Sequence, residues 1–184
     1  MIERNDHGPV RHLRINRPPA NALSPELISA LGEEVIRAPE DGARALVISG
    51  LPGMFSAGLD VPYLLRLDHH RIRATWDGFY RLLHALAGSP IPVVVAITGH
   101  APAGGTVIAL FCDYRVMAAG DAKLGLNEVR VGIPLPSTIY KALERLVGAR
   151  RAERLLVSGE LVAPEAALAM GLVDELVPAA EVEP

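Results

Sequence analysis

Short apolar runs alternate along this chain with longer segments in which apolar residues recur every three or four positions. The most apolar run, Val93–Thr98, shows no alternation, which predicts a parallel strand covered on both faces. A tight turn over Gly99–Gly105 follows, and a helix is expected to begin near Gly104. Further strands are predicted around Val10, Leu13 and Ile15 and over 43–49, 114–118 and 172–177, with an extended segment over 123–129.

Helices are predicted where the apolar spacing is three or four residues. Ser24, Pro25 and Glu26 combine a capping hydroxyl, a first-turn proline and an acid, as is typical of a helix start. The apolar face of that helix is expected to hold Leu27, Leu31, Val35 and Ile36. A second helix has the expected buried stripe Ile72, Trp76, Phe79, Leu83 and Leu86. Later helices are expected over 137–147, 149–157 and 164–170.

Strands and helices alternate without a repeat or a linker, so we expect one α/β domain over residues 1–184. Half of the residues are apolar and the net charge is −3 at pH 7, which argues against a basic nucleic-acid-binding surface. The single cysteine, Cys112, is expected inside the helix and excludes an intramolecular disulfide, which favours a reducing, intracellular setting. No peroxisomal tail or transit peptide is evident, so a cytoplasmic location is the default expectation. The charged start of the chain does not resemble a signal peptide. Glycines and a proline interrupt the only segment of membrane length, 91–112, so no membrane association is expected.

The sequence lacks the motifs of several common catalytic and binding sites, which argues against those sites. The chain contains no G-x-S-x-G elbow, no P-loop and no dinucleotide-binding glycine motif. His69 and His70 are adjacent and have no acid or cysteine at ligand spacing, so no metal site is expected. Four arginines surround Gly148, and a solvated helix face is the favoured interpretation, with binding of an anionic ligand as the alternative: Arg145, Arg150, Arg151 and Arg154.

Two features could carry chemistry, and each has a purely structural alternative. Gly104 and Gly105 allow backbone N–H groups to approach a ligand oxygen that gains negative charge, but they could equally serve packing alone. Glu128 lies between apolar residues and just before a turn at 132–134. If the carboxyl is partly desolvated, its pKa rises toward values suited to proton transfer, whereas an exposed edge position would leave it without a role.

Three ordered motifs together resemble the enoyl-CoA hydratase/isomerase, or crotonase, family. Residues 55–60 read FSAGLD and match the family's F-x-A-G-x-D loop. Residues 100–105, running on to 112–115, are similar to its second loop and helix, and 124–128 followed by 132–133 is similar to its acid-bearing segment. Residues 17–23 and 166–178 also fit, so the resemblance covers nearly the whole chain.

The resemblance implies a spiral core of ββα turns that acts on acyl-CoA thioesters. It implies that the backbone N–H groups of Leu59 and Gly104 hold the thioester oxygen, and that coenzyme A is part of the substrate, so no separate cofactor is expected. Residues implied to lie along the coenzyme A moiety are Ala20, Ala22, Ser56, Ala57, Asp60, Val61 and Gly105. Because the chain ends near the start of the family's C-terminal helical segment, we expect a core domain without those helices. A homotrimer or hexamer is expected if that segment is present.

The second family glutamate, which the hydratases use, is replaced here by Val107. Hydration is easiest with two carboxylates, whereas moving a double bond needs only one base, which Glu128 could supply. The residues of these motifs resemble those of the mitochondrial-type 3,2-trans-enoyl-CoA isomerases more closely than those of the hydratases. An isomerase is therefore the first expectation. A hydratase or another reaction of the family, such as thioester hydrolysis or decarboxylation, is the alternative. A non-catalytic acyl-CoA-binding or assembly subunit is the alternative from another class.

Overall fold

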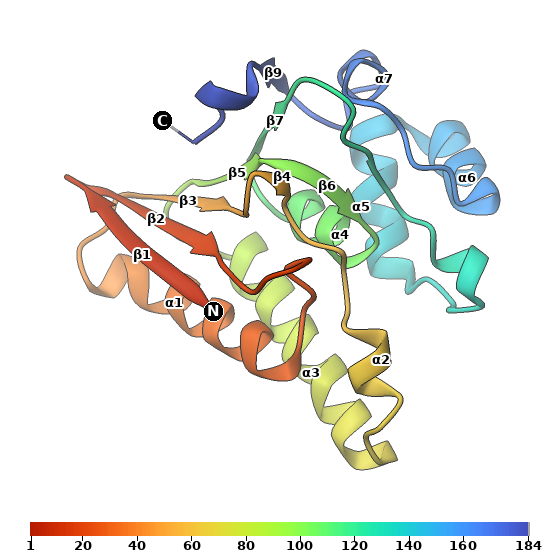
Figure 1. The fold of residues 1–184 in the computed structure, drawn as a ribbon, viewed down its shortest axis with the longest axis horizontal. Helices are drawn as coiled ribbons and strands as arrows, with labels where there is room; N and C mark the ends of the chain where they lie inside the picture. Colours follow the sequence, from red (N-terminus) through yellow and green to blue (C-terminus); the bar gives the residue numbers. More distant parts are fainter. Residues whose placement is uncertain (184) are drawn as a thin grey trace.

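The computed structural model describes residues 1–183 and contains two sheets (Figure 1). The larger has six strands in the order β1-β2-β3-β5-β7-β9. β1 and β2 pair antiparallel, and the other neighbours pair parallel. The parallel pairing predicted for the run Val93–Thr98 is thus confirmed in β5. The strands are β1 (Ile2–His7), β2 (Val10–Ile15), β3 (Ala45–Ser49), β5 (Val93–Ile97), β7 (Tyr114–Ala118) and β9 (Glu175–Val177). The α/β class is confirmed.

Two long helices, α1 (Pro25–Glu40) and α3 (His69–Ala87), pack against one another beside this sheet (Figure 1). The predicted start of α1 is confirmed, because the Ser24 Oγ accepts a hydrogen bond from the Leu27 N–H at 3.3 Å. The prediction for Ile36 is wrong: its side chain is 55% exposed. Adjacent helical residues lie about 100° apart, and only Val35 of the pair faces the core.

The remaining helices are short and lie mostly in the second half of the chain. They are α2 (Val61–Leu64), α4 (Gly104–Leu110), α5 (Ser137–Val147), α6 (Ala149–Ser158) and α7 (Pro164–Ala169), with 3₁₀ turns η1 (Glu128–Val131) and η2 (Ala179–Glu181). The helix predicted near Gly104 is confirmed, but it ends before the buried Cys112, which was expected inside it. Within residues 1–183, no helix combines the length and apolar character needed to cross a membrane.

The smaller sheet consists of three short strands that were not predicted. β4 (Gly53–Met54), β6 (Gly99–Pro102) and β8 (Leu124–Gly125) are all parallel, with β6 in the middle. They lie inside segments expected to be a loop, a turn and a longer extended stretch. Strands of two to four residues are too short to produce a recognisable apolar pattern. Because all three run in one direction, the chain segments that follow them leave the sheet at the same edge.

Close backbone contact between β4 and β6 makes Gly99 essential for this sheet. A Cβ at Gly99 would overlap the carbonyl group of Gly53, which no side-chain movement can relieve. We expect Gly99→Ala to destabilise the protein by at least about 3 kcal/mol, as measured by thermal or urea unfolding. Gly32→Ala in α1 is the matched control, since its added Cβ meets neighbours at an ordinary 3.9 Å. Equal stability of the two variants would contradict the close packing.

Candidate active site

The first family-like motif directly follows β4, whereas the second and third include residues of β6 and β8, so the small sheet brings the three motifs together. The Phe55 N–H, just after β4, donates to the His100 carbonyl in β6 at 3.0 Å. The Ala103 N–H, just after β6, donates to the Gly125 carbonyl in β8 at 2.8 Å. The Gly125 N–H in turn donates to the Thr106 Oγ1 at 2.7 Å. These bonds fix the first loop, the glycine turn and the acid-bearing segment side by side.

The first loop and the glycine turn approach each other at Gly58 and Gly104. A Cβ at Gly58 would lie 2.9 Å from the Gly104 nitrogen, and one at Gly104 would lie 3.3 Å from the Leu59 nitrogen. Among the described residues, neither the Leu59 N–H nor the Gly104 N–H donates a hydrogen bond. Ala103 holds φ at 49°, a strained value for a residue with a side chain, directly before Gly104. Two N–H donors from separate loops, both without an acceptor in the described part of the chain, therefore lie close together.

Glu128 is half-buried at the first position of η1, not in the extended segment that was expected. It lines a cavity of about 180 Å³ together with Leu59 and Gly104. Its Oε2 atom is buried and has no hydrogen-bond partner within residues 1–183. Burial raises the pKa of the carboxyl above its ordinary value, against a smaller opposing effect of a hydrogen bond from its own backbone N–H. Of the two interpretations of Glu128, the structure therefore supports the partly desolvated carboxyl over the exposed edge position.

The walls of this cavity are mostly apolar: Asn127 and Glu128 are the residues with polar side chains that form hydrogen bonds readily, and Glu128 is the one acidic residue among the described residues that line it. Val107 of α4 contributes to the wall and is only 1% exposed. Sequence reasoning did not assign several other wall residues to the site, because they come from a proline-rich segment without periodicity and from neighbouring helices. These are Val131, Ile133, Pro134, Leu135, Pro136 and Ile139. A carboxyl in such surroundings is poorly hydrated, which favours proton transfer at neutral pH.

Candidate coenzyme A residues with small or apolar side chains lie around the first loop. Ala57 and Val61 line the cavity that contains Glu128, whereas Ala20 and Ala22 are half-buried near the start of α1. The Ala57 N–H donates to the Ala20 carbonyl at 2.9 Å, which ties these two segments together. These residues therefore form one continuous region beside the cavity.

The remaining candidates, Ser56, Asp60 and Gly105, contribute to the local structure: the first two through side-chain hydrogen bonds, and the third because a side chain would not fit there. The Ser56 hydroxyl is buried, donating to the Asn21 carbonyl at 2.8 Å and accepting from the Gly58 N–H at 3.2 Å. Asp60 pairs with Arg17 at 2.8 Å and caps α2. A Cβ at Gly105 would lie 2.6 Å from the Ser56 carbonyl oxygen. Any contact of Ser56 with a ligand is therefore left to its backbone.

Asn21 is a structural residue that sequence reasoning missed. Its side-chain amide is fully buried and donates to the Ile15 carbonyl at 3.0 Å and to the Phe55 carbonyl at 3.0 Å. Its Oδ1 accepts from the Arg17 N–H at 2.8 Å. The only indication of this role in the sequence is that a polar residue stands between two alanines, Ala20 and Ala22. Asn21 thus holds the first loop against the end of β2.

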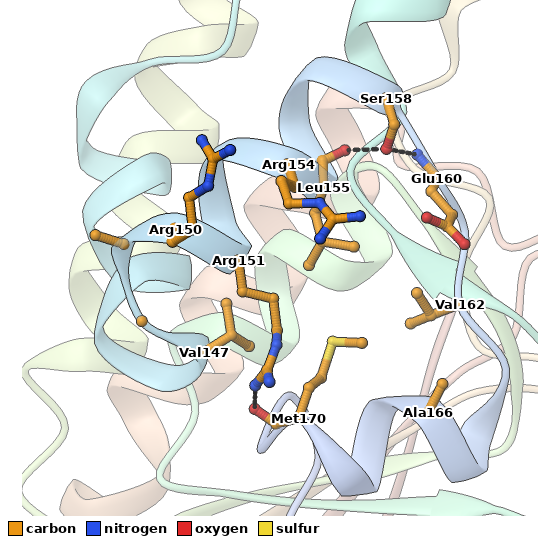
Figure 2. A pocket seen from close by; sticks show the side chains of 12 residues that line it. Val147, Arg150, Arg151, Arg154, Leu155, Ser158, Glu160, Val162, Ala166 and Met170 are labelled. Carbon is orange, nitrogen blue, oxygen red and sulfur yellow. Dashed lines mark hydrogen bonds between the residues drawn. The ribbon is translucent and has the colours of Figure 1, made fainter.

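The arginines of α6 lie around a different cavity, of about 730 Å³, that shares no lining residue with the first (Figure 2). Arg151 donates to the Met170 carbonyl at 3.4 Å, and Arg150 pairs with Glu153 at 3.4 Å while remaining exposed. Arg154 also lines this cavity, whereas Arg145 does not. The favoured interpretation, a solvated basic face, agrees with this exposure. Within residues 1–183, no group of three or more His, Cys, Asp or Glu residues is placed to hold a metal ion.

Comparison with known proteins identifies the family. The sequence model of the family described as enoyl-CoA hydratase/isomerase matches residues 6–184. Human mitochondrial enoyl-CoA delta isomerase 1 is 35% identical over all of this chain, and a putative enoyl-CoA hydratase of Thermus thermophilus is 35% identical over 94% of it. The chain spans 62% of the length of the human relative and 70% of the Thermus one.

Solved structures agree with the sequence comparison. The crystal structure of human mitochondrial delta3-delta2-enoyl-CoA isomerase superposes with a TM-score of 0.94 at 34% identity, covering 98% of this chain and 72% of that one. Pseudomonas aeruginosa DspI superposes with a TM-score of 0.91 at 33% identity, covering 98% and 75%. The expected crotonase-like fold is confirmed. The chain belongs to the enoyl-CoA hydratase/isomerase family.

Proposed function

We propose that this protein is an enoyl-CoA isomerase that moves a double bond from C3 to C2 of an acyl-CoA thioester. The observation that carries the proposal is a single half-buried acid, Glu128, in one cavity with Leu59 and Gly104, whose backbone N–H groups have no acceptor within residues 1–183. The family supports an acyl-CoA substrate. Because coenzyme A is part of that substrate, the proposal includes no further cofactor.

The proposed reaction has two proton transfers and one intermediate. The thioester oxygen accepts hydrogen bonds from the Leu59 and Gly104 N–H groups, which stabilise the negative charge that develops there. Glu128 removes a proton from C2, and the electron pair of the C–H bond passes into a dienolate that extends from the thioester oxygen to C4. Glu128 then returns the proton to C4, which leaves a double bond between C2 and C3. No atom is gained or lost, and one carboxylate performs both steps.

Val107 favours isomerisation over hydration. Addition of water across a double bond is helped by two carboxylates that position and activate the water molecule. Val107, which the family resemblance puts at the position of the second hydratase glutamate, is buried and lines this cavity. An apolar wall there gives a water molecule no acid to bind beside the reacting carbons. The hydratase remains the second candidate, because relatives named as hydratases are as similar in sequence as the isomerases.

Product analysis tests this function directly. We expect 3-enoyl-CoA to be converted to 2-enoyl-CoA of the same mass, because the protein adds and removes only a proton. Mass spectrometry after chromatography separates this outcome from hydration, which adds one water molecule and gives 3-hydroxyacyl-CoA. Incubation of 2-enoyl-CoA alone is the control for hydratase activity. A 3-hydroxyacyl product as the main species would support the hydratase instead, and no product despite binding of a saturated acyl-CoA would support a non-catalytic binding subunit.

A further inference from the structure

An apolar groove continues the cavity that contains Glu128. The groove has a volume of about 470 Å³ and is lined by residues of α2, α3 and the 133–136 segment. Six residues line both spaces: Leu59, Val61, Trp76, Ile133, Pro134 and Pro136. The groove and the cavity are therefore two parts of one depression, joined at these residues.

The chemistry of the groove suits a hydrocarbon chain. None of the described residues that line it is charged, and Leu65 and Tyr80 at its outer end are exposed by 80% and 37%. Exposed apolar surface of this kind marks a site for an apolar ligand or partner. The cavity around Glu128, at about 180 Å³, is smaller than most small-molecule sites, which span about 300–1,000 Å³. An acyl chain that begins beside Glu128 soon fills that cavity. Two spaces adjoin it: the groove, and a space of about 360 Å³ that Glu128 itself lines. Of the two, the groove is the one without a charged residue among its described lining residues, and it therefore suits the rest of the chain better.

Trp76 lies at the junction of the two spaces. Its ring is 6.3 Å from that of Phe79, edge to face, and 6.3 Å from that of Tyr80. Phe79 is buried and lines only the cavity, whereas Tyr80 is partly exposed and lines only the groove. The three rings of α3 thus lead from the reacting end to the open end. Trp76 is the largest of the six side chains common to both spaces and therefore offers the most surface to an acyl chain that passes from one to the other.

We propose that Trp76 sets the preference for acyl-chain length at the site of the isomerase function proposed above, on which this inference rests. Acyl chains long enough to extend past the indole bind more tightly, because their outer methylenes are buried in the groove. Shorter acyl chains end inside the cavity and do not reach the groove. Each methylene that becomes buried strengthens binding by up to about fourfold, so affinity rises with length beyond the indole. The substrate class is therefore long-chain rather than short-chain 3-enoyl-CoA.

Trp76 is also the only tryptophan of the chain, so its fluorescence reports on the groove. We expect tetradecanoyl-CoA to shift the emission to shorter wavelength, because the acyl chain displaces water from the indole. Coenzyme A alone and acetyl-CoA should leave the emission unchanged. Saturated chains are used because they bind without turnover. Binding of every chain length by calorimetry, with no emission shift for the long chain, would overturn the inference and leave the proposed function standing.

Variants give a second, independent test. Trp76→Ala should lower the ratio of tetradecanoyl-CoA affinity to butanoyl-CoA affinity by about tenfold, since the contact with two or three methylenes is lost. Trp76→Phe should restore most of the ratio, and Ile36→Ala, an exposed apolar change on α1 outside both spaces, should leave it unchanged. An unchanged ratio in Trp76→Ala would overturn the inference. Failure of the wild-type protein to bind any acyl-CoA would overturn the proposed function and this inference together.

Discussion

Glu128→Gln is expected to lower the turnover of 3-enoyl-CoA by about 10²–10⁴-fold, the usual contribution of a positioned acid or base. Glutamine has nearly the same shape and fills the same space, so binding of a saturated acyl-CoA should persist. The Oε2 atom of Glu128 is buried and has no hydrogen-bond partner among residues 1–183, so in the proposed reaction it can accept a proton from the substrate. Steady-state kinetics and calorimetry on the same variant separate the two effects. Full turnover in Glu128→Gln would remove this residue from the mechanism.

The pH dependence of the wild-type enzyme has a definite direction. In the proposed reaction Glu128 must be ionised to remove a proton from C2, and burial raises its pKa above the ordinary value of 4.5. The kcat/KM for isomerisation should therefore decrease as the pH falls through this raised pKa, at a higher pH than for an exposed glutamate. Glu160→Gln, which removes an exposed carboxylate at the arginine-lined cavity, should leave both the profile and the turnover unchanged.

Gly58→Ala should reduce kcat by about 10²–10³-fold, the cost that accompanies loss of one donor to a developing oxyanion. A Cβ at Gly58 would lie 2.9 Å from the Gly104 nitrogen and 3.1 Å from the Ala103 Cβ. The first loop and the glycine turn would have to separate, and the Leu59 and Gly104 N–H groups would no longer point at one oxygen. Measured kcat for 3-enoyl-CoA checks this expectation.

Gly53→Ala is the control that distinguishes steric overlap of the added Cβ from backbone strain at a positive φ. Gly53 has φ of 79°, close to the 84° of Gly58, but a Cβ at Gly53 would have no atom of residues 1–183 within 4 Å. Both variants should lose stability because alanine disfavours this backbone conformation. Only Gly58→Ala should lose activity beyond what the loss of folded protein explains. Equal activity of the two variants would show that the approach of the loops does not matter for catalysis.

The sequence predicts the large sheet and its helices well, because these elements bury continuous or periodic apolar residues. The predicted ranges 114–118 and 137–147 coincide with β7 and α5, and Ser24 caps α1 as expected. β1 was not predicted, since its residues are mostly charged or polar and exposed at the edge of the sheet. Ile36 shows the limit of spacing arguments, because a residue one step from a buried position can face solvent.

The candidate site could be predicted only in part. Gly104 and Glu128 each left two interpretations open, because neither residue alone reveals what lies opposite it. In the structure both residues line one cavity, because β4, β6 and β8 hold their segments side by side. The sequence pattern does not predict these three strands. Trp76 belongs to an expected buried stripe, yet it is half-buried and lines both the cavity and the groove. Such roles depend on contacts between distant segments, which periodicity does not encode.

A crystal structure of the complex with a saturated acyl-CoA such as octanoyl-CoA is the most direct test of the central claim. We expect the thioester oxygen about 2.7–3.1 Å from both the Leu59 and the Gly104 nitrogens, the range for donors to an oxyanion. The Glu128 carboxylate should lie beside C2 and C4 of the acyl chain. A thioester bound elsewhere, or one of the two N–H groups turned away from its oxygen, would contradict the proposed mechanism.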